Sequence, residues 1–187
     1  DTATTVIRDV LKLESIEKVK DNEILELVED KLVSEGKMPS KFLRTVQEIM
    51  KAKKDYDDKK LSKVEIEKIH RDAGALIRFM VEYMPRKRGR ELERLKIRVK
   101  HGDKFGEVTI LGNTAYIIRD IDSEEKELEK AKLRDDGSLG PAEKSSFEEM
   151  EKSLAGIQLP QKTAIKEPIF EDLKRIFGRD VEILMGY

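Results

Sequence analysis

The sequence lacks the side chains that most often carry redox and metal chemistry. Its 187 residues include no cysteine, no tryptophan and only two histidines, His70 and His101. Without cysteine there are no disulfides, no thiol nucleophile and no thiolate zinc site. Two histidines are too few for a histidine-rich metal site. We therefore expect no cofactor.

Long apolar runs are also missing. No stretch approaches the roughly 20 apolar residues that cross a bilayer, and no charged-then-apolar signal segment opens the chain. We expect a cytoplasmic protein that does not bind a membrane. The chain begins at Asp1 and not at Met, which suggests a further domain upstream.

Charge is abundant. Charged residues make up 41% of the chain and hydrophobic residues 38%, with a net charge of −1. Balanced charge with this many aliphatic residues indicates a folded protein with an ionic surface, not a disordered one. The excess of Lys, Glu and Arg is typical of thermophilic proteins, archaeal ones included, in which surface ion-pair networks contribute more as temperature rises.

The first half of the chain has the apolar periodicity of helices. Apolar residues recur at helical spacing over residues 2–13, 22–33, 41–56 and 62–84. Gly36 and Pro39 punctuate the second and third stretches. The fourth starts at Ser62, which forms a capping-box pattern with Glu65. Residues 1–85 are therefore predicted to form an up-and-down bundle of about four helices.

The second half has the pattern of a small α+β domain. Val108–Leu111 and Ala115–Ile118 are β-branched runs joined by Gly112-Asn113, a favoured hairpin turn. Both faces of this hairpin are apolar, so we expect it to be covered on two sides. Residues 127–140 have the pattern of a weakly alternating strand that ends in a Gly-rich turn. A helix ending at Gly156, a helix ending at Gly178 and a strand over Val181–Met185 follow. The fold class is predicted as α+β, with the helical bundle in residues 1–85 and an antiparallel sheet within residues 86–187.

The junction between the halves carries a dense run of cations. Residues 86–104 hold nine cations against Glu91, Glu93 and Asp103, so nine minus three leaves a local charge of +6. Clustered cations neutralise phosphates, and the planar fork of Arg suits phosphate oxygens. If Arg94, Lys96, Arg98 and Lys100 share a strand, they point the same way and form one cationic row. The predicted phosphate-contacting residues are Arg86, Lys87, Arg88, Arg90, Arg94, Arg98 and Lys100.

Two other interpretations stay open for this region. The run can be a solvated seam at which Pro85 and Gly89 interrupt the long helix, with the acidic segment 122–151 as its partner inside the chain. Asp120 and Asp122 follow a strand, and two carboxylates at this spacing are weak candidates for a divalent metal in nucleotidyl transfer. A polar turn at the end of the strand explains the same two aspartates.

The segment from residue 32 to 84 resembles the HEPN family of helical bundles. Gly36 and Pro39 at a helix opening, a turn over residues 53–57 with Lys53, Asp55, Tyr56 and Asp57, and the long helix from Ser62 carry the resemblance. Some members are ribonucleases that use an Arg followed by a His at the end of the third helix. This chain has no such pair there; Arg94 and His101 have a permitted spacing but fall outside the bundle.

The resemblance implies a role beside a small nucleotidyltransferase domain and a homodimer formed through long helices. Our leading interpretation is thus a non-catalytic region that binds RNA or another nucleic acid, or a nucleotide, within a larger nucleotidyltransferase-type protein. The alternative is an oligomerisation module that binds only protein, for which Met80 and Met84 are candidate contacts if they are not core residues. The third is a metal-dependent enzyme that uses Asp120 and Asp122.

Overall fold

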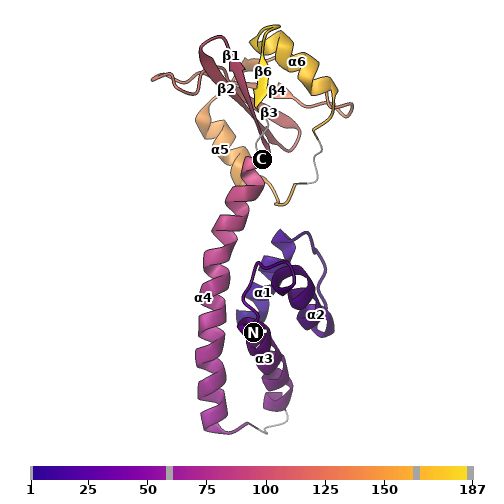
Figure 1. Cartoon of the computed structure of the whole chain (residues 1–187), viewed down its shortest axis with the longest axis vertical. Helices are drawn as coiled ribbons and strands as arrows, with labels where there is room; N and C mark the ends of the chain where they lie inside the picture. Colours follow the sequence, from indigo (N-terminus) through magenta and orange to yellow (C-terminus); the bar gives the residue numbers. More distant parts are fainter. Residues whose placement is uncertain (1, 58–60, 162–164, 185–187) are drawn as a thin grey trace. The chain divides into compact units, whose positions relative to one another are not determined.

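The computed structural model describes residues 2–57, 61–161 and 165–184. The chain divides into two compact units, Asp1–Gly89 and Arg90–Tyr187, and each is described by itself. Helices form the first unit and a six-stranded antiparallel sheet lies in the second (Figure 1). The predicted α+β fold class is therefore confirmed.

The helices of the first unit lie where the apolar periodicity indicated. They are α1 (Thr2–Leu13), α2 (Ile24–Val28), α3 (Lys41–Asp57) and α4 (Lys63–Glu93), the last of which continues into the second unit. The second predicted helix is composite, because a 3-10 turn (Asp21–Glu23) precedes α2 and a π-helical turn (Glu29–Val33) follows it. Gly36, at φ +68°, ends that segment in the left-handed region that favours glycine.

The core of the first unit is built from the apolar faces of these helices. Ile7, Ile24, Val46 and Leu76 are fully buried in one cluster. Met80 is buried in this cluster and Met84 packs against it. Met80 is therefore a core residue, and the partly buried Met84 lies at the edge of that core.

Helix α4 starts as predicted but ends later. The backbone N–H of Ser62 donates to Glu65 Oε2 at 2.9 Å, and the Glu65 N–H donates to Ser62 Oγ at 3.4 Å, which completes the capping box. The hydrogen bonds from Ser62 lower the pKa of the Glu65 carboxyl. The predicted interruption at Pro85 and Gly89 is wrong, because α4 runs through both to Glu93. Pro85 lies on the exposed side of α4, and Val81, whose carbonyl oxygen lacks the N–H donor that Pro85 cannot supply, is exposed as well.

The sheet of the second unit has the strand order β5-β4-β3-β2-β1-β6. Strands β2 (Lys104–Leu111) and β3 (Thr114–Ile118) form the predicted hairpin, with Leu111 opposite Thr114 and Gly112 at φ +62°. The other strands and the two helices that follow α4 are β1 (Lys96–His101), β4 (Leu128–Lys132), β5 (Glu143–Lys144), β6 (Glu182–Leu184), α5 (Phe147–Gly156) and α6 (Pro168–Phe177). The two-residue strand β5 was not predicted, and Met185 at the end of the predicted last strand lies outside the described residues.

The central hairpin is covered on both faces, as its apolar pattern predicted. Val108 and Ile117, which lie opposite each other, belong to the cluster that α6 completes with Leu173. The alternate residues face the other way, and there Tyr116 shares a 2.6 Å hydrogen bond with Ser153 of α5. Figure 1 shows α5 and α6 beside the sheet. Within the described parts of the chain, no helix is long and apolar enough to cross a membrane.

Candidate nucleic-acid interface

The basic stretch lies in two different settings. Arg86, Lys87 and Arg88 lie on α4 in the first unit. In the second unit, Arg90 lies on the last turns of α4, Arg94 follows that helix, and β1 begins only at Lys96. The predicted cationic row is therefore shorter than expected, because Arg94 is not part of the strand.

The cations of β1 are neutralised locally. Lys96 Nζ lies 3.0 Å from Glu93 Oε1 and 3.8 Å from Glu107 Oε1. The Arg98 guanidinium lies 3.2 Å from Glu93 Oε2 and 3.4 Å from Glu107 Oε2. Arg98 and Glu107 pair directly across β1 and β2, which brings opposite charges together on one face of the sheet. The hydrogen bond from Lys96 lowers the pKa of Glu93.

Two further cations of the second unit also have acidic partners. Arg94 Nη1 lies 3.2 Å from Oε1 of the buried Glu91. Lys104 Nζ lies 3.5 Å from Asp120 Oδ2. Lys100 is half-buried and makes no ion pair with any residue that the structure describes.

Lys87 forms an ion pair with a buried glutamate of the first unit. Its Nζ lies 3.4 Å from Oε2 of Glu14, whose side chain is 4% exposed. Lys37 and the Tyr83 hydroxyl also donate to this carboxylate. Burial acts to raise the pKa of Glu14, but the hydrogen bonds from Lys37 and Tyr83 and the charges of both lysines outweigh it, so the pKa is lowered. Lys87 was predicted to contact phosphate, and its 13% exposed side chain is instead committed to this network.

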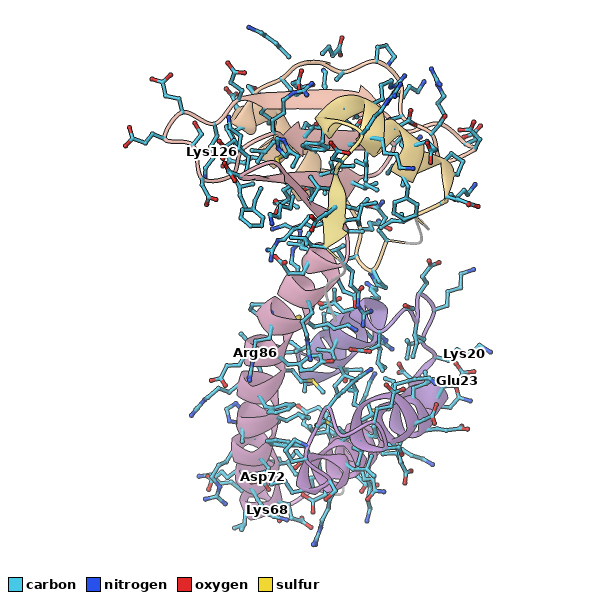
Figure 2. The ribbon with its side chains drawn as sticks, turned by 45° about the horizontal axis from the view of Figure 1, so that its top comes forward. Lys20, Glu23, Lys68, Asp72, Arg86 and Lys126 are labelled. Carbon is cyan, nitrogen blue, oxygen red and sulfur yellow. The ribbon has the colours of Figure 1, made fainter. Side chains whose placement is uncertain are left out.

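The remaining arginines of α4 are exposed. The Nε of Arg86 donates to the carbonyl oxygen of Glu82 at 3.1 Å, and its guanidinium reaches the Glu82 carboxylate only at 4.0 Å. Figure 2 shows Arg86 on the side of α4 away from α1 to α3. Arg88 and Arg90 are also exposed, and neither pairs with a carboxylate anywhere in residues 2–57, 61–161 or 165–184. These three side chains remain accessible to an external anion.

The aspartate pair after β3 forms a turn. Asp120 Oδ1 accepts a hydrogen bond of 3.1 Å from the backbone N–H of Asp122, which is the geometry of an Asx turn. Among the described residues, no group of three or more His, Asp or Glu side chains is placed to hold a metal ion. His70 is exposed on α4.

Arg94 and His101, which have the Arg-to-His spacing of the ribonucleases but lie outside the bundle, are at opposite ends of one strand. Arg94 precedes β1, whereas His101 ends it, with His101 Nε2 2.6 Å from the carbonyl oxygen of Arg119 and its ring 5.1 Å from that of Phe177. Arg94 and His101 therefore do not form a catalytic pair. The turn expected over residues 53–57 is the last part of α3, and Lys53 within it pairs with Asp21 at 3.0 Å.

A pocket between α3 and α4 lies outside the basic stretch. Its charged lining mixes signs, and Lys68 Nζ lies 3.3 Å from Glu48 Oε1 within it. The pocket is lined by Glu48, Lys51, Ala52, Asp55, Leu61, Glu65, Lys68 and Ile69. Mixed charge of this kind does not select an anion, so the arginines of α4 are the stronger candidate site.

Comparison with protein-family models, with curated proteins and with solved structures found no match.

Proposed function

We propose that this chain binds nucleic acid through phosphate contacts made by the exposed arginines at the end of α4. Arg86, Arg88 and Arg90 are the residues that would carry the contacts, within a cytoplasmic protein. The resemblance to HEPN bundles is the basis for expecting a nucleotidyltransferase domain in the same protein, in which this region would serve binding and docking and not catalysis.

The observation that supports this proposal is that some cations of the basic stretch are paired with carboxylates and others are not. Lys87, Lys96 and Arg98 are held by carboxylates within 4 Å. Arg88 and Arg90 have no such partner in the described chain, and Arg86 has only a distant one. Arg88 and Arg90 have no side-chain partner among the described residues, and Arg86 donates only its Nε, to the Glu82 carbonyl oxygen. The terminal nitrogens of an Arg bind phosphate oxygens in a bidentate manner. Of the seven predicted contacts, these three are the best supported.

The test is a titration of labelled RNA with the full chain at two salt concentrations. Phosphate contacts make log K fall linearly with log salt, with a slope of about −0.9 for each contact in a duplex. The triple substitution Arg86→Ala, Arg88→Ala and Arg90→Ala should weaken binding severely and flatten this slope. The matched control is Lys96→Ala with Arg98→Ala, which removes two cations that are already paired. Absence of binding at low salt, or an equal effect of both sets, would refute the proposal.

The two alternatives receive less support from the geometry. The hypothesis of a module that binds only protein relied on Met80 and Met84 as exposed contacts. Met80 lies in the core and Met84 packs against it. A metal-dependent enzyme was to use Asp120 and Asp122, which form a turn, with Asp120 beside Lys104. A salt-independent self-association with no affinity for RNA would favour the first alternative over nucleic-acid binding.

A further inference from the structure

Helix α4 presents a second set of arginines that the basic stretch does not include. Arg71 and Arg78 are exposed, and neither makes an ion pair or hydrogen bond with any described residue. They lie before residue 84, among the apolar residues of the helix, so no dense run of cations marks them in the sequence.

These arginines share one side of the helix with Arg86. Successive residues of an α-helix turn by about 100°, so Arg71, Arg78 and Arg86 fall within an arc of about 80°. The buried side chains Leu76, Met80 and Tyr83 lie on the opposite side. We call the exposed side the outer face of α4, defined by Arg71, Gly74, Arg78, Glu82 and Arg86, all of which belong to the first unit.

The spacing along the outer face is regular and fixed by the helix. At about 1.5 Å per residue, Arg71 and Arg78 are about 10 Å apart along the axis, and Arg78 and Arg86 about 12 Å. The three guanidinium groups span about 22 Å, the length of six to seven base pairs of a duplex at about 3.4 Å per step. Between residues 71 and 89 the helix carries five cations and two carboxylates, so its net charge is five minus two, or +3.

The outer face carries one residue without a side chain, Gly74, which lies along the helix between Arg71 and Arg78. A Cβ added at Gly74 would meet no heavy atom within 4 Å, so packing within the described chain does not require glycine there. Glycine in the interior of an exposed helix costs about 1 kcal/mol relative to alanine. A small residue between two arginines lets a phosphodiester backbone approach the helix closely.

The outer face, as defined by its five residues, carries no aromatic side chain on which bases could stack. The large apolar side chains that α4 exposes are Val64, Ile66 and Val81, and none is aromatic. Proteins that bind single strands combine cations with aromatic side chains on which bases stack. Contacts from arginines alone suit the backbone of a double helix, which is already ordered and presents phosphates at a fixed spacing.

We propose that the outer face of α4 binds the backbone of a double-stranded nucleic acid without reading its sequence, and that Arg71 and Arg78 contact phosphates beyond those reached by Arg86. This extends the proposed function and rests on it. Glu82, also on this face, opposes binding and keeps Arg86 partly engaged.

The experiment uses fluorescence anisotropy to measure the affinity of the full chain for a 16-base-pair duplex and for one of its single strands, over a range of salt concentrations. The duplex is more than twice as long as the expected footprint. Arg71→Ala and Arg78→Ala should each weaken duplex binding several-fold and reduce the salt slope by about one. The control is Arg44→Ala, an exposed arginine on α3 that lies 3.4 Å from Glu48 and should leave binding unchanged. Gly74→Gln should raise the melting temperature yet weaken duplex binding, a combination that general misfolding does not produce.

The outcomes separate this inference from the proposed function. If Arg71→Ala and Arg78→Ala bind as the unchanged chain does while the Arg86, Arg88 and Arg90 triple variant is weakened, the extension along the outer face fails and the proposed function stands. If the single strand binds more tightly than the duplex, the assignment to double-stranded nucleic acid fails. If neither set of substitutions changes affinity or salt slope, both proposals fall.

Discussion

Lys87 and Arg88 are neighbours in the sequence with opposite surroundings. Lys87 points into the core of the first unit and joins the buried Glu14, whereas Arg88 is exposed without an acidic partner among the described residues. The same contrast divides the whole basic stretch, because Lys96 and Arg98 on β1 are held by Glu93 and Glu107. A count of cations therefore measures charge but not availability, which depends on the carboxylates that the fold brings within reach.

Identical substitutions of Lys87 and Arg88 should have opposite effects on stability and on binding. Lys87→Met removes one ion-pair partner of a buried carboxylate. It should lower the free energy of unfolding by about 2 kcal/mol, between the values for an exposed ion pair and for a buried one that loses a partner. Arg88→Met should change stability by less than about 0.5 kcal/mol, as surface substitutions do, and weaken RNA binding instead. Urea unfolding and anisotropy titration measure the two effects. Equal stability losses in both variants would show that the contrast is not real.

Acid should weaken the buried network that Glu14 forms with Lys37 and Lys87. The pKa of Glu14 is lowered, so its contribution to stability is complete above the ordinary pKa of a glutamate and is lost as pH falls through the lowered value. Glu14→Gln cannot release or take up this proton, so we expect its unfolding free energy to be reduced at neutral pH and to fall less steeply below pH 4.5, the ordinary value. Urea unfolding at a series of pH values tests this.

The control for the acid experiment is Glu26→Gln, an exposed side chain on α2. Its acid dependence should match that of the unchanged chain. If Glu14→Gln were to keep the full acid dependence, the coupling of Glu14 to Lys37 and Lys87 would contribute nothing to stability.

The two paired cations of β1, Lys96 and Arg98, can be freed by removing their carboxylate partners. Glu93→Gln with Glu107→Gln removes the two carboxylates that hold Lys96 and Arg98 and should turn them into free cations. If a bound nucleic acid reaches them, its salt slope steepens by up to about 1.8, two contacts at about 0.9 each. We expect a stability cost of up to about 2 kcal/mol, because the pairs of the exposed Glu93 contribute about 1 kcal/mol or less and those of Glu107, 13% exposed, contribute more. Unchanged affinity would place β1 outside the nucleic-acid interface.

Local signals were enough to predict most of the fold. The capping box at Ser62, the Gly112-Asn113 turn and the helix-ending Gly178 are short-range chemistry, and each lies where it was expected. The continuation of α4 through Pro85 was missed because local propensity counts against a helical proline. Packing on the buried side of α4 by residues such as Tyr83 supports the helix at that point, and it is a long-range effect.

The candidate site was predicted less well, for the same reason. Lys87 meets Glu14 across 73 positions of the chain, and the sequence around Lys87 carries no sign of this partner. Arg98 meets Glu107 only because of the register of β1 and β2. For Arg71 and Arg78, a helical projection of residues 63–93 gives the signal that a search for clustered charge overlooks.

Substitution of Glu82 should have the smallest effect on nucleic-acid affinity of the changes considered. It is the one carboxylate within 4.0 Å of the Arg86 guanidinium in the described chain, and both side chains are exposed. Glu82→Gln should leave the melting temperature nearly unchanged, because a surface pair at this distance contributes little. It should raise affinity for a duplex about twofold, equivalent to about 0.4 kcal/mol, since it removes a negative charge from the outer face and releases Arg86. Anisotropy titration of Glu82→Gln beside the control Glu26→Gln measures this gain, and a loss of affinity would mean that Glu82 orients Arg86 for binding and does not compete with it.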